Sequence, residues 1–325
     1  MFFKEHLSRI AARAVAGIAA VAALASCGGG TYQEQTFIPA RILTFGDESS
    51  RLETVQGLKY SINGISTATL QIDCTQAPIW TQLLAVSYSI VYPDCNIDAS
   101  NQTQGVDLTT VNGTVADVVQ QVAAFQAGDT FNGNDLVTIW VGMHDVINDY
   151  EANGAGDEGT LESDMNASGS TLANLVNSIA ATGAKVMLLT VPDMSDTPFA
   201  WTEEQRGDFD RLKVLSDMST QFNLGLRSNI LNDGSKIGLV LVDDIVRNMV
   251  QSPGSYGLIS LDNETYGCLD SAPLPTCTTD TLRTDPSTGQ PATAAFLWAD
   301  ATHLGSVGQA QIGNQASGRA HSNPF

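Results

Sequence analysis

Basic side chains are scarce in this chain of 325 residues, which has 15 Lys and Arg against 35 Asp and Glu and a formal net charge of −20. A nucleic-acid partner is excluded, because phosphate binding needs a basic surface. The same imbalance disfavours docking of the folded chain on anionic lipid headgroups. Hydrophobic residues make up 43% of the chain, which is ample for a core and excludes a disordered protein.

Local signatures of metal and nucleophile sites are also lacking. The chain has four His and five Cys, with neither Cys-x-x-Cys nor His-Glu-x-x-His spacing. We therefore expect no metal site and no cofactor. The motif Gly-x-Ser-x-Gly does not occur either, which disfavours a hydrolase with a nucleophile elbow.

The first 26 residues have the features of an export signal. Basic residues at positions 4, 9 and 13 precede an apolar stretch from Ala14 to Leu24. This stretch has about half of the ~20 residues that a membrane-spanning helix needs. We expect residues 1–26 to be a signal peptide that is removed.

The end of this segment matches the bacterial lipobox, in the tetrapeptide Leu24-Ala25-Ser26-Cys27. We expect lipidation of Cys27, and residues 27–40 to form a lipidated N-terminus and tether. An ordinary signal peptide with a chance cysteine is the alternative. Gly28 after the cysteine is similar to lipoproteins sent to the outer membrane. The expectation is a bacterial envelope protein held at the outer membrane by acyl chains alone.

Four cysteines remain after Cys27: Cys74, Cys95, Cys268 and Cys277. An even number in an exported chain suggests two disulfides. Three pairings exist, and we favour the local ones, Cys74–Cys95 and Cys268–Cys277. Free thiols are the alternative.

Apolar runs alternate with helical patterns along the rest of the chain. The runs at 41–46, 135–142, 185–192 and 238–244 are nearly continuous, as in strands buried on both faces of a parallel sheet. Helical periodicity covers about 115–128, 172–179, 203–231 and 306–316. This order predicts an α/β fold, a three-layer α/β/α sandwich with a mainly parallel sheet. A hairpin over 59–72 and a long loop over 256–293 interrupt it.

Ligands of such sheets bind beyond the carboxyl ends of the strands. Three motifs stand there: Phe45-Gly46-Asp47-Glu48-Ser49-Ser50, Gly142-Met143-His144-Asp145 and Asp300-Ala301-Thr302-His303. At these motifs the chain resembles the GDSL (SGNH) family of ester hydrolases. The resemblance covers about residues 41–320 and implies one SGNH-hydrolase-like domain.

The resemblance also implies a chemistry. In that family a serine attacks an acyl carbon, a histidine takes its proton, an aspartate orients the histidine, and glycine and asparagine groups hold the oxyanion. Asp300 and His303 match the last pair, with a capping aspartate and a surface histidine as the alternative. Gly105 is the candidate oxyanion glycine, from its order along the chain. The implied function is an esterase or lipase with a small acyl-ester substrate, and we expect a monomer.

Two positions depart from the family motif. Glu48 stands at the nucleophile position and His144 at the position of the oxyanion asparagine, whereas Ser49 is one residue late. A one-residue step moves the Cα by ~3.8 Å and, on a helix, rotates the side chain by roughly 100°. A local bulge is therefore needed to bring Ser49 Oγ to His303.

Several roles for the substituted residues stay open. Glu48 is an ion partner of His303, a general base for water, or a direct nucleophile. His144 donates to an oxyanion or pairs with Asp145. We favour Ser49 as the nucleophile of weak ester hydrolysis centred on His303. The alternative is a catalytically silent protein that binds an acyl or glycan ligand in the same cleft.

Overall fold

A computed structural model describes residues 37–96, 103–153, 157–259, 265–285, 289 and 295–322. The chain divides into one unit of residues Met1–Thr36 and another of residues Phe37–Phe325, and the description below concerns the second. The expected signal peptide, the lipidation of Cys27 and most of the tether lie outside the described residues and stay predictions. Among the described helices, none is long and apolar enough to cross a bilayer.

The second unit is built on a five-stranded sheet in the order β2-β1-β3-β4-β5, and every neighbouring pair is parallel. Its central strands are almost completely buried, which explains their continuous apolar sequence. The predicted α/β class and mainly parallel sheet are confirmed. The strands are β1 (Arg41–Gly46), β2 (Gly105–Asp107), β3 (Asp135–Trp140), β4 (Lys185–Leu189) and β5 (Ile237–Val240).

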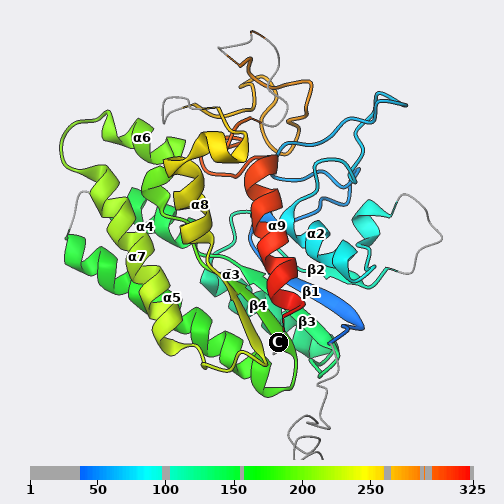
Figure 1. Cartoon of the computed structure of the whole chain (residues 1–325). Coiled ribbons are helices and arrows are strands. Elements are labelled where there is room, and N and C mark those ends of the chain that lie inside the picture. Colours follow the sequence, from blue (N-terminus) through cyan, green and yellow to red (C-terminus); the bar gives the residue numbers. More distant parts are fainter. Residues whose placement is uncertain are drawn as a thin grey trace, which may run out of the picture. The chain divides into compact units, whose positions relative to one another are not determined.

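Helices cover both faces of this sheet (Figure 1). The step from β1 to β2 runs opposite to the later steps, so right-handed crossovers place their helices on opposite faces. Accordingly, α2 packs on α9, whereas α5 packs on α3 and α7. The helices are α2 (Trp80–Ser87), α3 (Val115–Gly128), α4 (Met143–Asn153), α5 (Glu158–Ala181), α6 (Pro198–Glu204), α7 (Arg211–Asn229), α8 (Val242–Gln251) and α9 (Ser306–Ala320).

Several predicted boundaries were wrong. The helix expected over 203–231 is two helices, because Gly207 adopts a positive φ of 66° and the side chain of Asp210 caps the new start at α7. The run at 238–244 stops being a strand at Val240, where α8 follows. The hairpin over 59–72 is a series of turns with an isolated antiparallel bridge between Ile65 and Ile72.

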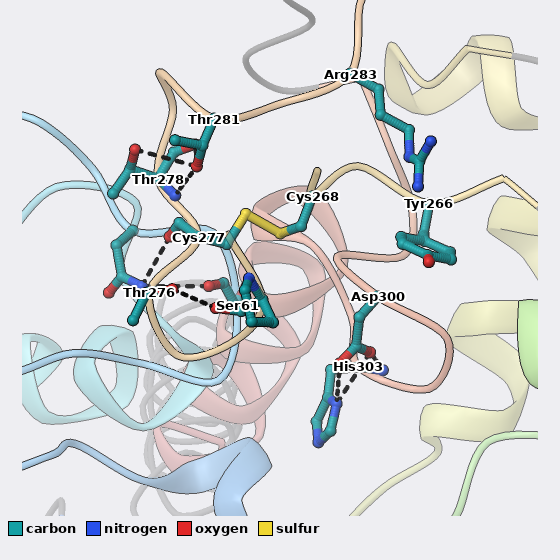
Figure 2. Close-up of a disulfide and its surroundings, with 12 residues drawn as sticks. Ser61, Tyr266, Cys268, Thr276, Cys277, Thr278, Thr281, Arg283, Asp300 and His303 are labelled. Atoms are coloured by element: carbon teal, nitrogen blue, oxygen red, sulfur yellow. Dashed lines mark hydrogen bonds and ion pairs between the residues drawn. A yellow bond between two sulfur atoms is a disulfide. The ribbon is translucent and has the colours of Figure 1, made fainter. Parts of the chain in front are cut away.

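Both predicted disulfides are present, Cys74–Cys95 and Cys268–Cys277. The second lies in the predicted long loop, whose described part contains turns and isolated bridges but neither a helix nor a multi-residue strand after residue 265. Figure 2 shows this disulfide above the loop that carries Asp300 and His303.

Candidate active site

The ends of β1 and β3 bring two of the three motifs together. These strands are neighbours, with Gly46 opposite Trp140. A side chain at Gly46, which has a φ of 134°, would collide with the Trp140 carbonyl at 2.0 Å. Gly142 has a φ of 125° and lies against Phe222 in the same manner. Both glycines are therefore required where the chain leaves the sheet for the site.

A short 3₁₀ helix, η1 (Glu48–Ser50), begins directly after β1. Asp47 caps it, because its Oδ1 accepts a hydrogen bond from the Ser49 backbone N–H at 2.9 Å. The side chain of Glu48 projects from the first position of this turn and is almost fully buried. After the neighbouring strand β3, α4 begins at Met143, directly after Gly142, and carries His144 in its first turn.

The third motif lies on the loop before α9. Asp300 Oδ1 accepts hydrogen bonds from the backbone N–H groups of Thr302 and His303, which closes a tight turn. The Ala299 N–H donates to the His303 carbonyl, and Cys268 N–H donates to the Ala299 carbonyl at 2.8 Å. The turn is thus hydrogen-bonded to the Cys268–Cys277 loop, and Figure 2 shows the two segments next to each other.

The side chains of these motifs form one continuous chain of hydrogen bonds. Both oxygens of Asp300 lie 3.0 Å from His303 Nδ1. His303 Nε2 lies 3.0 Å from Glu48 Oε1, and His144 Nε2 lies 2.7 Å from that same oxygen. Glu48 Oε2 accepts a hydrogen bond of 2.6 Å from the backbone N–H of Asn112. Glu48 is therefore the centre of the site.

Burial and ion pairing shift the pKa values of this cluster in opposite directions. Burial lowers the pKa of His303, but Asp300 and Glu48 outweigh it and raise this pKa to about 10. Burial alone would raise the pKa of Glu48, yet hydrogen bonds from both histidines hold it well below its usual range. The pKa of Asp47 rises to about 7, through burial first and the charge of Glu48 second. The cluster therefore holds Glu48 as a carboxylate beside a cationic His303.

The structure does not bring Ser49, the predicted nucleophile, to His303. No bulge interrupts η1, and Ser49 Oγ is buried without a hydrogen-bond partner among the described residues. His303 Nε2 instead contacts Glu48. The physical reason is the Asp47 cap, which starts the turn at Glu48 and leaves its side chain, rather than that of Ser49, against the histidine.

Gly105 lies away from the site, so its assignment to the oxyanion hole is not supported. It pairs with Ile42 in the sheet, six residues before Glu48, and a side chain there would strike the Tyr92 ring. The N–H that reaches Glu48 belongs to Asn112, which has a positive φ of 56°. The sequence analysis missed this loop, although the pair Asn112-Gly113 is a common turn signal that could have identified it.

Among the described residues, no hydrogen bond joins His144 to Asp145, the pairing considered from the sequence. The carboxylate of Asp145 accepts hydrogen bonds from the Val115 N–H at the start of α3, whereas His144 turns to Glu48. Two roles were considered for Asp300, capping a turn and orienting His303. The structure shows contacts for both, because this carboxylate closes the turn and also contacts the His303 ring.

Fold and site together define an α/β/α sandwich protein with an Asp–His pair and a buried glutamate at the carboxyl end of its sheet. No protein-family model matches the chain. It is 27% identical over 148 residues to the phosphatidylcholine-sterol acyltransferase of Aeromonas hydrophila. The aligned residues make up 45% of this chain and 41% of that protein. The chain thus spans less than half the length of this curated relative.

Solved structures with a similar chain path include esterases and lipases. The acetylxylan esterase Axe2 of Geobacillus stearothermophilus is 15% identical, with 89% of this chain and 97% of that chain covered and a TM-score of 0.43. The extracellular lipase of Streptomyces rimosus is 12% identical, with 87% and 100% covered and a TM-score of 0.45. The lipase Lip_vut3 from a goat rumen metagenome is 11% identical, with 88% and 99% covered and a TM-score of 0.46.

Proposed function

We propose that this protein is a hydrolase of carboxylic esters whose reacting groups are Glu48 and His303 rather than a serine. The observation that carries the proposal is the contact of 3.0 Å between His303 Nε2 and Glu48 Oε1, with Asp300 on the other ring nitrogen. An Asp–His pair aimed at a third group is the arrangement of a catalytic triad, and here that third group is a carboxylate.

The proposed reaction is the direct addition of water to the ester. Glu48 takes a proton from a water molecule while the water oxygen adds to the acyl carbon. His303 then donates its proton to the alcohol oxygen as the carbon–oxygen bond breaks, which releases an acid and an alcohol. Glu48 passes its proton to His303 across their hydrogen bond and restores the starting state. Asp300 positions the His303 ring throughout.

We expect this reaction to be slow. Both oxygens of Glu48 already accept hydrogen bonds, from two histidine rings and from the Asn112 N–H. A substrate water must compete with these donors for the lone pairs of the carboxylate. The partial likeness to a lipid acyltransferase supports an acyl ester as the substrate class.

A second function is favoured by the burial of the same carboxylate. Glu48 is only 1% exposed, and its Oε2 accepts the hydrogen bond from the Asn112 N–H. These features suit a catalytically silent protein that binds an acyl or glycan ligand near the site. Activity measurements distinguish the two functions.

The test is hydrolysis of short-chain nitrophenyl esters by the wild type, His303→Gln and the control His321→Gln. His321 is an exposed histidine outside the site, with its ring near Ser87. We expect His303→Gln to lower the rate at least about 100-fold, as for loss of a general acid, and His321→Gln to leave it unchanged. A wild-type rate equal to that of His303→Gln contradicts the hydrolase and favours the silent protein.

We further propose that the protein acts in the bacterial envelope, anchored at the outer membrane by a lipidated Cys27. The lipobox at 24–27 and the two disulfides support this location, because disulfides persist in oxidising compartments. Radiolabelled palmitate is expected to enter the wild type and not Cys27→Ala. Equal labelling of both proteins contradicts the anchor.

A further inference from the structure

We propose that Glu48, His144 and His303 form a binding site for one divalent transition-metal ion of the zinc class. The inference deepens the proposed function, because it names a cofactor for the same centre. It rests on that function only for the catalytic role of the ion, since binding is measured without a substrate.

The geometry of the three ligand atoms carries the inference. One ligand atom from each residue lies within 4.8 Å of the others. Glu48 Oε1 is 2.7 Å from His144 Nε2 and 3.0 Å from His303 Nε2. Zinc–ligand bonds of about 2.0–2.2 Å place neighbouring ligand atoms of a tetrahedron roughly 3.3 Å apart. A shift of less than about 1 Å therefore makes room for an ion where the protons of these hydrogen bonds now lie.

The surrounding contacts prepare the ligands for such an ion. The carboxylate of Asp300 faces His303 Nδ1, which fixes the ring and directs Nε2 towards the centre. Carboxylate–histidine–metal chains of this kind are usual around zinc. The Asn112 N–H holds Glu48 Oε2, so Oε1 is left to bind the ion as a single ligand.

The two departures from the GDSL motif point the same way. The motif has serine and asparagine where this chain has Glu48 and His144. Many residue types at position 48 would remove a serine nucleophile without supplying a metal ligand. Here the pair of changes replaces two poor metal ligands with a carboxylate and an imidazole, and these two side chains contact each other. Two nitrogen donors and one oxygen donor suit zinc or a neighbouring transition metal rather than calcium or magnesium.

A second acidic cluster provides a contrast. Glu158, Glu162 and Asp217 also lie within reach of one another, but they offer carboxylates only and are exposed or half-buried. Lys213 forms ion pairs with Glu158 and Asp217 and already supplies positive charge there. We do not expect zinc to bind at this cluster.

Three protein ligands leave a fourth position for water, whose pKa zinc lowers to about 7. The hydroxide would add to the acyl carbon of an ester, the bond to the alcohol oxygen would break, and the proton of the water would pass to the alcohol. In this form Glu48 is a ligand and no longer the base.

Calorimetric titration of the purified protein, without a polyhistidine tag, with ZnCl₂ tests the inference. CoCl₂ is the spectroscopic probe, and MgCl₂ is the control ion. We expect one high-affinity zinc per chain in the wild type and in the surface control His321→Gln. Glu48→Gln, His144→Asn and His303→Gln are each expected to weaken binding at least about tenfold. With cobalt, the wild type is expected to give visible absorption typical of four-coordinate Co²⁺, and His144→Asn is not.

Circular dichroism checks that each variant folds. If a ligand variant does not fold, Asp300→Asn replaces it, because loss of the carboxylate that holds a metal-binding histidine weakens metal binding by about 10–100-fold. Equal zinc affinity in the wild type and in every folded variant overturns the inference. Ester hydrolysis without zinc binding overturns it and leaves the proposed function standing. Zinc binding without hydrolysis upholds the site and contradicts the proposed function.

Discussion

His144 Nε2 lies 2.7 Å from Glu48 Oε1, and these are the two residues at which the sequence differs from the GDSL motif that it resembles. The two differences from that motif are therefore in direct contact in the fold. A carboxylate without His144 would lose one of its two histidine donors, and His144 without the carboxylate would lose its buried partner. A variant in which both residues are replaced together therefore leaves neither side chain buried without its partner.

The first prediction concerns a variant in which Glu48 and His144 are both replaced by the residues of the GDSL motif. In Glu48→Ser with His144→Asn, a shorter hydroxyl side chain replaces the carboxylate that contacts His303, and Asp300 still orients the ring. We expect the double variant to react covalently with a fluorophosphonate probe, because a serine held by an Asp–His pair is nucleophilic. Mass spectrometry measures the adduct.

The wild type and the double variant that also carries His303→Ala are the controls for this labelling, and neither is expected to react. Labelling of the wild type at Ser49 contradicts the account, since it requires a geometry in which Ser49 reaches His303.

The second prediction compares the two disulfides. In the chain-entropy model, loss of either bridge lowers the free energy of unfolding by roughly 3 kcal/mol, with the larger loss for the longer Cys74–Cys95 loop. The rate of ester hydrolysis should fall more on loss of the Cys268–Cys277 bridge. The reason is that the Cys268 N–H donates a hydrogen bond to the carbonyl of Ala299, the residue before Asp300. Serine replacements of each pair, compared by denaturant unfolding and ester assay, measure both quantities. A larger activity loss at the 74–95 bridge contradicts this role of the 268–277 loop.

The third prediction concerns Asp196, at the end of the short 3₁₀ helix η3 (Met194–Asp196). Burial, with the nearby charge of Asp193 as a smaller cause, raises the pKa of Asp196 from 3.8 to about 6. The folded state therefore binds more protons than the unfolded state between these values, so the contribution of Asp196 to stability falls as pH rises towards 6.

Asp196→Asn removes this cost. We expect the variant to be more stable than the wild type at about pH 8, and the gain to vanish at about pH 4. Thermal unfolding at both pH values measures the difference, with the exposed Asp164→Asn as control. A gain that does not change with pH contradicts the titration of Asp196.

The sheet and the position of the site were predictable because they depend on local patterns. Continuous apolar runs identified four of the five strands, and their carboxyl ends carry Glu48 and His144. The missed strand, β2, has only three residues, which is too short for a periodic signal. The same gap misled the choice of Gly105, which had only its order along the chain to support it.

The details of the site depend on contacts between distant segments, which spacing does not reveal. Whether Glu48 or Ser49 meets His303 is decided by the Asp47 cap and the start of η1. The three candidate metal ligands come from positions 48, 144 and 303, so no short motif marks them. The sequence analysis accordingly expected no metal site, whereas the fold brings these three side chains together at the carboxyl end of the sheet.

The most direct test of the central claim is the rate of nitrophenyl ester hydrolysis by Ser49→Ala and Glu48→Gln, measured in parallel with the wild type. Glu48→Gln keeps the shape of the side chain but removes the carboxylate that contacts His303 and His144. The account predicts that Ser49→Ala keeps the wild-type rate and that Glu48→Gln loses about 100-fold or more. Loss of hydrolysis in Ser49→Ala, with activity retained in Glu48→Gln, would contradict it.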